Sequence, residues 1–201
     1  IQLGYQHRGI EKLFLTKKFL NKCVLAESVS GDSAIAHNTA YLNAAESLCI
    51  CHISRSAEIV RAVALELERI GMHLFGLGAL CNDVAYLTGS SVFGARRTLV
   101  INTSLALCGS RFGRGWLRPG GCVFGISESQ KKTMIDTLNK VKFDVDQMAE
   151  VMFENATFHS RLDQTGVVDK TTAEKLNLSG MAARASGLNV DIRKNHPFGF
   201  Y

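Results

Sequence analysis

The segment ESVSGDSAIAH, Glu27 to His37, carries side chains at the spacing of a metal-binding turn, but with the wrong chemistry. Ser30 and Ser33 lie three residues apart, and His37 follows four residues later. With cysteines in place of both serines, the pattern would be Cys-x-x-Cys-x-x-x-His. A thiolate is a soft ligand for nickel and iron, whereas a serine hydroxyl is a hard oxygen that stays protonated near neutral pH. We therefore predict no metal at Ser30, Ser33 or His37, and a helix N-terminus capped by Asp32 or Ser33 accounts for the same residues.

Cysteines elsewhere offer a second candidate for metal chemistry. Cys49, Cys51 and His52 form a Cys-x-Cys-His triplet, but no second ligand pair follows at the spacing of a zinc site. The six cysteines are scattered over apolar stretches, at positions 23, 49, 51, 81, 108 and 122. This distribution predicts reduced, buried thiols in a cytosolic setting and no disulfide framework.

Arginines and one acid could act on a ligand without a metal. Arg111, Arg114 and Arg118 lie in the segment GSRFGRGWLRPGG, where glycines let backbone amides approach a ligand and guanidinium groups pair with carboxylates. The segment could form an anion cradle, and the same arginines could equally bind helix C-termini or acidic groups on a partner. Asp83 follows a strongly apolar stretch, where an acid is paired, tuned for proton transfer, or placed at a solvated helix end.

Helical periodicity accounts for most of the chain. Apolar residues recur at helical spacing over five segments: Leu13–Leu20, Ser33–Leu48, about Ser56 to Ala85, Ala95–Leu107 and Gln130–Phe153. The longest of them begins after Ser54 or Ser56. Gly109–Ile126 is predicted as a loop or short extended segment, and a short helix is expected around Thr172–Leu176. The predicted fold is mainly α, a helical bundle with short extended Gly/Arg-rich segments.

Length and composition describe one large domain of 201 residues, 46% hydrophobic and 20% charged. The net charge of +5 is spread in ones and twos without a nucleic-acid signature, so it predicts no nucleic-acid partner and suits docking on an acidic protein. No apolar run reaches membrane-spanning length without a charge, and Ile1–Leu20 is unlike a secretory signal. Ile1 and Tyr201 look like cuts inside a longer protein, so residues 1–201 are expected to be its central helical region.

Six blocks, taken in order, resemble one protein family. They are GYQHRGIEKL (Gly4–Leu13), GDSAIAHNTAY (Gly31–Tyr41), RAVALELERIGMHLFGLGALCNDVAY (Arg61–Tyr86), GSRFGRGWLRPGG (Gly109–Gly121), TGVVDKTTAEKLNLSG (Thr165–Gly180) and RASGLNVDIRKNHPF (Arg184–Phe198). Together they resemble the large subunits of energy-converting nickel-iron hydrogenases and, equally, the homologous 49 kDa subunit of respiratory complex I. The resemblance spans nearly the whole chain and implies the helical bundle core of the hydrogenase large subunit.

The resemblance also implies what is missing. In the hydrogenases, the turn that corresponds to Ser30–Ser33 carries the first cysteine pair of the nickel-iron centre, so both ligand positions differ here. The second pair of that family lies near the C-terminus, beyond Tyr201. The complex I subunit also lacks these thiolates, and its cavity at this place binds a quinone head group. Where that subunit has the tyrosine that bonds quinone, this chain has Gly31, and its Gly-Asp turn resembles a hydrogenase or formate hydrogenlyase relative without metal ligands.

Site residues follow from the same resemblance. Asp83 falls on the acid thought to pass protons from the quinone site, and His37 on the wall of the old metal cavity, so these two are the candidate catalytic residues. Gly31, Asp32 and Arg118 are the candidate cofactor-binding residues. Asp83 is expected beside the cavity that includes His37, in a mostly apolar surround. Structural ion pairs are the favoured role for a larger set, which includes Arg118: Arg61, Glu66, Arg69, His73, Arg118, Arg184, Asp191 and Arg193.

Two functions remain open. One is a subunit of a membrane-associated oxidoreductase of the NADH dehydrogenase type, with quinone and NAD binding as properties of the family; this chain would form one wall of a quinone-like cavity. It would bind no cofactor itself and receive electrons from an iron-sulfur small subunit, with membrane subunits as further partners, in the cytoplasm and peripheral to the inner membrane. The other is a non-catalytic scaffold related to hydrogenase or formate hydrogenlyase. An active nickel-iron hydrogenase would need thiolates that Ser30 and Ser33 do not provide.

Overall fold

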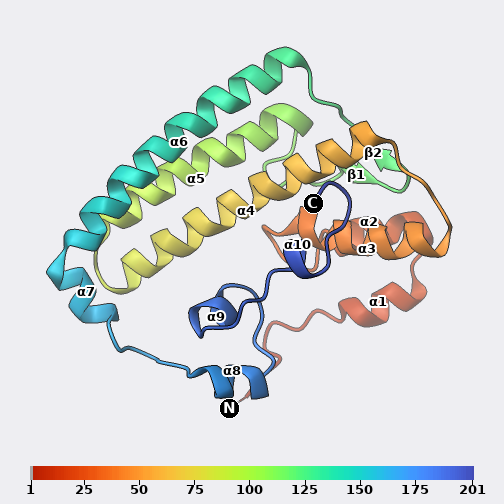
Figure 1. Cartoon of the computed structure of the whole chain (residues 1–201). Coiled ribbons are helices and arrows are strands. Elements are labelled where there is room, and N and C mark those ends of the chain that lie inside the picture. Colours follow the sequence, from red (N-terminus) through yellow and green to blue (C-terminus); the bar gives the residue numbers. More distant parts are fainter. Residues whose placement is uncertain (1) are drawn as a thin grey trace.

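The computed structural model describes residues 2–201 (Figure 1). This part of the chain is mainly helical, as predicted, with ten helices and one two-stranded hairpin. In order they are α1 (Ile10–Thr16), α2 (Phe19–Ala26), α3 (Ala34–Leu48), α4 (Arg55–Asp83), α5 (Leu87–Cys108), β1 (Leu117–Arg118), β2 (Gly121–Cys122), α6 (Glu128–Glu154), α7 (Ala156–Leu162), α8 (Lys170–Lys175), α9 (Gly180–Ala185) and α10 (Ile192–Asn195).

Three long helices, α4, α5 and α6, lie side by side and form the body of the molecule (Figure 1). Their facing apolar stripes bury Leu74, Phe93, Val100 and Val141. The predicted longest helix is confirmed as α4, and its N-cap Ser54 accepts a hydrogen bond from the amide of Ala57 at 3.3 Å. The sequence predicted these helices because a helix that buries one face carries apolar residues on that face at helical spacing.

Helix α5 begins at Leu87, eight residues before the predicted Ala95, so the prediction missed its first two turns. The reason is packing against α4. A Cβ atom at Gly89 would lie 2.8 Å from the sulfur of Cys81, and one at Gly78 would lie 3.6 Å from Phe93. Glycines lower helix propensity, but here they let two helices approach closely, and tertiary contact overrides the local preference.

The predicted helix Leu13–Leu20 is wrong in its extent. Two short helices, α1 and α2, cover this region, and the extended residues Lys17 and Lys18 separate them. No glycine or proline marks the break, so periodicity alone could not place it. The predicted helix Ser33–Leu48 is confirmed as α3, and it packs beside α2 and α4 (Figure 1).

The Gly/Arg-rich segment is a loop that ends in a hairpin, as predicted. Leu117 pairs with Cys122, and the connecting turn has Gly120 at a φ of 82°, which a type II turn requires. Gly113 also has a positive φ, and a Cβ atom there would lie 2.5 Å from the side chain of Ile35. The loop is therefore pressed directly onto the start of α3. Trp116, which is 1% exposed, donates from its indole nitrogen to the carbonyl of Phe124.

The last part of the chain returns across the other helices as α7 to α10 (Figure 1). Only α8 matches the short helix expected around Thr172–Leu176, and α7, α9 and α10 were missed because they are too short for a periodicity signal. The Tyr201 hydroxyl donates to Glu66 and ties the segment to α4. Within residues 2–201, none of the helices combines the length and hydropathy that crossing a bilayer would take.

All six cysteines are free. Cys23, Cys81 and Cys108 are buried, as predicted, and Cys122 is half-buried. Cys49 and Cys51 are exposed because α3 ends at Leu48 and the chain then runs along the surface to α4. The expectation of buried thiols is therefore wrong for this pair.

Candidate functional site

The Ser30–Ser33 turn joins α2 to α3 and is held by arginines from three distant segments. Arg8 donates to the carbonyl of Val29 at 2.7 Å and also to that of Ser28. Arg114, from the loop after α5, donates to the carbonyl of Gly31 at 2.8 Å. Arg97, on α5, forms an ion pair with Asp32 at 3.0 Å. Arginines from the N-terminal segment, from α5 and from the loop after α5 thus fix this turn.

On one side of this turn lies a surface depression of about 660 Å³, which we call the turn hollow. It is lined by the N-terminal segment and by the first half of the turn: Tyr5, Gln6, His7, Arg8, Val29, Ser30 and Gly31. The hollow is open to solvent, and most of its lining residues are polar. His7, on this lining, lies 3.2 Å from Glu11 of α1 through its Nε2 atom.

On the other side of the turn lies a small cavity between α3, α4 and α5, which we call the inner cavity. Its volume is about 20 Å³, room for roughly one water molecule. The charged residues on its wall are Asp32, Glu68, Arg97 and Arg111. Most of the other lining side chains are aromatic or aliphatic, among them Ile35, Phe112 and Trp116. A quinone ring does not fit in a space of this size.

Glu68 connects the inner cavity to the start of α3. Its two carboxylate oxygens accept hydrogen bonds from the backbone amides of Ile35 at 2.7 Å and Ala36 at 2.9 Å. Burial raises the pKa of Glu68 to about 7, and these two amides act in the opposite direction. The prediction that Asp32 or Ser33 caps α3 is wrong, since neither makes a side-chain cap. Asp32 is instead paired with Arg97, and a carboxylate from α4 takes its place.

A second buried acid links the other end of the turn to the Gly/Arg-rich loop. Glu27 is 5% exposed, and its Oε1 accepts from the side-chain amide of Asn38 and from the backbone amide of Gly115, both at 2.9 Å. Burial raises the pKa of Glu27, and the bond from Gly115 partly offsets this. Neither Glu27 nor Glu68 was predicted as a site residue. The available signal for Glu68 was a carboxylate between apolar residues of a predicted helix, whereas Glu27 directly follows the last residue of α2.

Arg61 and Glu46 form a buried ion pair with two hydrogen bonds of 2.8 and 2.7 Å. Burial favours a higher pKa for Glu46, but the bonds from Arg61 and the amide of Gly120 outweigh it, so the pKa is lowered. Arg61 also donates to the carbonyl of Arg118 at 2.9 Å, which locks the hairpin onto α4. The predicted structural role of Arg61 is confirmed.

Of the other residues expected in ion pairs, Glu66, Arg69, Asp191 and Arg193 form them, whereas His73 and Arg118 form none among residues 2–201. Arg193 pairs with Asp191 at 2.8 Å and approaches Glu66 at 3.6 Å, and Glu66 also pairs with Arg69. Bonds from Arg193 lower the pKa of Asp191. Arg184 donates to the carbonyl of Val190 instead of to an acid. These contacts hold α10 and the final residues against α4.

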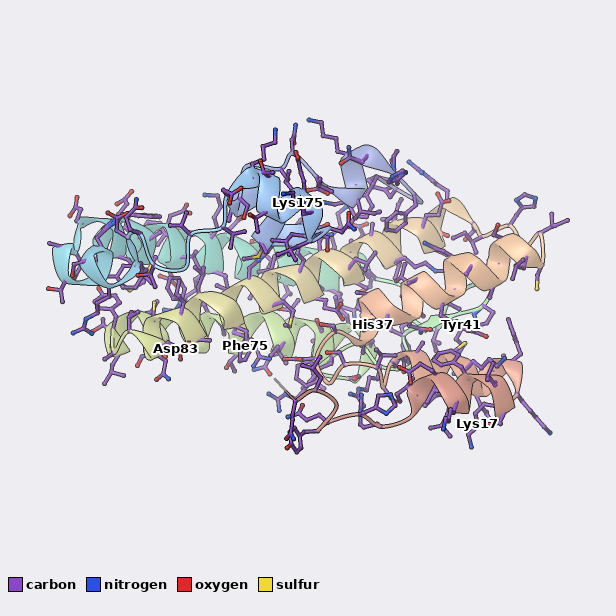
Figure 2. All side chains as sticks on the ribbon, turned by 90° about the horizontal axis from the view of Figure 1, so that it is seen from below. Lys17, His37, Tyr41, Phe75, Asp83 and Lys175 are labelled. Carbon is purple, nitrogen blue, oxygen red and sulfur yellow. The ribbon has the colours of Figure 1, made fainter. Side chains whose placement is uncertain are left out.

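The structure does not bring the two candidate catalytic residues together. Figure 2 shows Asp83 at one end of α4 and His37 on α3, well away from it. Glu68 marks the place where α4 meets the start of α3, and Asp83 lies fifteen residues further along the helix, about 22 Å away at the rise of an α-helix. Asp83 is exposed and His37 is half-buried. The expectation of Asp83 beside the His37 cavity in an apolar surround is therefore wrong.

The candidate cofactor-binding residues separate as well. Gly31 lines the turn hollow and Asp32 lines the inner cavity, so the two lie on opposite sides of one turn. Arg118 belongs to β1, its side chain is exposed, and its backbone carbonyl faces Arg61. Arg111 stacks near Phe112 at 5.7 Å while Arg114 reaches Gly31, so the arginines of this loop point to different partners and form no single anion cradle.

The turn does not suit the nickel-iron centre of the hydrogenases. Ser30 and Ser33 offer half-buried hydroxyl oxygens where that centre needs thiolates. In the part of the chain from residue 2 onward, no group of three or more His, Cys, Asp and Glu side chains is arranged to hold a metal ion. The donor set of the turn therefore does not fit that centre.

Comparison with known proteins agrees with this architecture. The chain is 30% identical over its whole length to a subunit of the NADH-quinone oxidoreductase of Campylobacter curvus, and it covers 49% of that protein. It is 29% identical to the alpha subunit of the membrane-bound hydrogenase of Pyrococcus furiosus, of which it covers 47%. The chain thus spans about half the length of these curated relatives.

Solved structures give the same result for the fold. A chain of the membrane-bound sulfane sulfur reductase, an archaeal respiratory membrane complex, superposes with a TM-score of 0.93 at 26% identity. The match covers 98% of this chain and 53% of that one, which confirms the hydrogenase-like large-subunit fold. Residues 83–201 match the family model of the respiratory-chain NADH dehydrogenase, 49 Kd subunit. The chain therefore belongs to the family of the 49 kDa subunit of the respiratory-chain NADH dehydrogenase, which includes hydrogenase-like relatives.

Proposed function

We propose that this chain is a subunit of a membrane-associated electron-transfer complex and that its turn hollow receives the head group of a quinone-like acceptor. The observation that carries the proposal is the hollow itself, about 660 Å³ in volume, at the turn where the hydrogenases bind their metals. The names of the relatives favour a complex of this type, since they include a quinone oxidoreductase and membrane-bound respiratory enzymes.

The chemistry of the hollow suits a quinone. Arg8 carries N–H groups that can donate to carbonyl oxygens, and Val29 offers an apolar contact for the ring. The Tyr5 hydroxyl already donates to Gln2, and the Nε2 atom of His7 faces Glu11. Gly31 leaves the floor open, because no heavy atom lies within 4 Å of a Cβ atom built there. A ring could therefore lie against the turn without displacing a side chain.

In this proposal the chain binds no redox cofactor of its own. Electrons reach the hollow from an iron-sulfur cluster on a partner subunit, and membrane subunits complete the assembly. NADH as donor, and NAD binding, belong to the complex as a whole. The location we propose is the cytoplasmic side of the inner membrane, where the chain is held through its partners.

A non-catalytic scaffold, like a hydrogenase or formate hydrogenlyase subunit without metals, is the alternative. The observation in its favour is the rigidity of the turn, which Arg8, Arg97 and Arg114 clamp from three sides. A chain selected only to hold its partners would keep such contacts and need no acceptor in the hollow.

A substitution that fills the turn hollow with a larger side chain tests the proposal. Gly31→Leu adds an isobutyl group into open space at a residue whose φ is not positive, so we expect normal assembly and an acceptor reduction rate at least tenfold lower. Gly76→Leu is the matched control, since Gly76 lies on α4 and also has open space around it. The measurements are reduction of a soluble quinone by membranes, binding of a quinone analogue to the purified complex, and pull-down of the iron-sulfur subunit. Equal rates and binding for Gly31→Leu, Gly76→Leu and the parent would favour the scaffold.

A further inference from the structure

Glu68 stands at the point where the turn, α3 and the long helix α4 meet. Its carboxylate accepts hydrogen bonds from the backbone amides of Ile35 and Ala36, the first residues of α3 after Ala34. Glu68 itself lies on α4, 33 residues after Ile35 in the chain. The turn that forms the wall of the hollow ends at Ser33, immediately before these amides. The amides that Glu68 binds therefore follow, directly in the chain, the turn that lines the hollow.

The surroundings of Glu68 leave it free to exchange a proton. It lines the inner cavity, which is large enough for about one water molecule. Arg97, on the same cavity wall, has a buried Nε with no hydrogen-bond partner among residues 2–201, so a water there would have a donor to bind. The cavity thus places room for about one water molecule beside the carboxylate.

The charged groups that face Glu68 come from each element packed against it. Asp32, in the turn, repels its negative charge, while Arg69 on α4 attracts it. Arg97 on α5 is paired with Asp32, and Arg111 lies on the loop wall of the same cavity. Burial raises the pKa of Glu68 to about 7, so both forms are populated near neutral pH.

We propose that Glu68 is a positioning residue for the Ser30–Ser33 turn: its ionised carboxylate binds both leading amides of α3 and holds the wall of the hollow, and protonation weakens this attachment. A carboxylate offers two charged acceptor oxygens, whereas a carboxylic acid offers one good carbonyl acceptor and a hydroxyl that is a poor one. The turn is therefore fastened above neutral pH and loosened below it. This inference rests on the proposed function only for its effect on turnover.

Hydrogen exchange of the purified complex tests the attachment without reference to any acceptor. At about pH 8, above the Glu68 pKa, we expect the amides at the start of α3 to be protected roughly fivefold more than at about pH 6, after correction for intrinsic rates. The start of α6 is an internal control, because Ser127 and Gln130 cap it and neither titrates. Equal protection of the α3 amides at both pH values would overturn the proposal.

Glu68→Gln tests the assignment to this residue. The amide keeps the shape but has one acceptor oxygen, so we expect weaker protection of the α3 amides that no longer changes with pH. Glu150→Gln, an exposed position on α6, removes the same charge elsewhere and should behave like the parent. A pH dependence that persists in Glu68→Gln would contradict the proposal.

Turnover gives the functional readout. If an acceptor is reduced in the turn hollow, the rate of quinone reduction should decrease as the pH falls below 7, both in the parent and in Glu150→Gln. Glu68→Gln should have a lower rate, and that rate should not show this decrease. Pull-down of the iron-sulfur subunit shows whether each variant assembles. Absence of quinone reduction in the parent would refute the proposed function, while the exchange result would still decide the role of Glu68. Parallel pH profiles for the parent and Glu68→Gln would count against Glu68.

Discussion

Glu68 binds the amides of Ile35 and Ala36 although Asp32 and Ser33 lie next to them in the chain. Two energetic effects of its ionisation therefore oppose each other. The charged carboxylate makes stronger hydrogen bonds to the amides, which lowers its pKa. It also loses hydration because the side chain is half-buried, and this larger effect raises the pKa. The turn can thus be held more firmly at high pH while the native state as a whole favours the protonated acid.

The free energy of unfolding should record the second effect. Because the native pKa of Glu68 lies above its ordinary value of 4.5, the native state binds more protons than the unfolded state between about pH 4.5 and 7. The contribution of Glu68 to stability should fall as pH rises through this window and stay constant above it. Urea unfolding of the full-length subunit at several pH values should show this slope in the parent and not in Glu68→Gln. Identical slopes in both proteins would contradict the raised pKa.

Asp83 remains a candidate for proton transfer on the resemblance to complex I, although it lies at the far end of α4 (Figure 2). It does not line the turn hollow, so we expect it to have less influence on an acceptor there. We expect Asp83→Asn to slow quinone reduction less than Glu68→Gln does and to leave assembly intact. Turnover in membranes and pull-down of the iron-sulfur subunit measure both effects. A larger loss in Asp83→Asn would place the proton path at that end of the helix.

At the scale of single elements, close approach of α4 and α5 depends on small residues. Gly89→Ala should place a methyl group 2.8 Å from the sulfur of Cys81 and from the ring of Tyr86, which requires both elements to shift. We expect a loss of about 1–3 kcal/mol in the free energy of unfolding, as for other overpacked sites. Gly94→Ala, on the same helix and in open space, should be neutral or stabilising by about 0.5–1 kcal/mol. Urea unfolding compares the two, and equal effects would show that the contact at Gly89 is not limiting.

Long elements could be predicted from the sequence, and their breaks could not. The apolar stripes predicted α4 and α6 nearly to their ends because each helix buries one continuous face. The start of α5 was hidden by glycines that serve packing, and the break at Lys17 and Lys18 has no local marker. For the site, the turn was identified, but its contacts were not, since Glu68 and the arginines reach it from segments far away in the chain.

At the scale of the whole molecule, the hydrogenase-like frame carries Ser30 and Ser33 in the turn between α2 and α3. The buried pair of Arg61 and Glu46, together with Glu27, anchors the Gly/Arg-rich loop to α3 and α4. These contacts do not depend on a metal. The frame can therefore persist whether or not the turn coordinates anything.

The prediction at this scale concerns the metal content of the purified protein. We expect the purified full-length subunit, separated from its partners, to contain no stoichiometric nickel, because Ser30 and Ser33 lack the charge and softness of thiolates. Elemental analysis measures nickel and iron per chain. The double variant Ser30→Ala/Ser33→Ala is the control, and its metal content should equal that of the parent. Stoichiometric nickel in the parent that the double variant loses would contradict this prediction.

The cap that α4 provides to α3 has a consequence for how the chain folds. Helices α4 and α6 are each capped by side chains next to their own first turn, so these turns can form without a partner from a distant segment. Helix α3 has no side-chain cap of its own, and its partner is 33 residues away, so closing that loop must precede a stable first turn. We expect α3 to form late, after α4, and Glu68→Gln to speed unfolding while it leaves the folding rate nearly unchanged. A chain that emerges from the ribosome would then complete the turn only once the helix beyond it has been made.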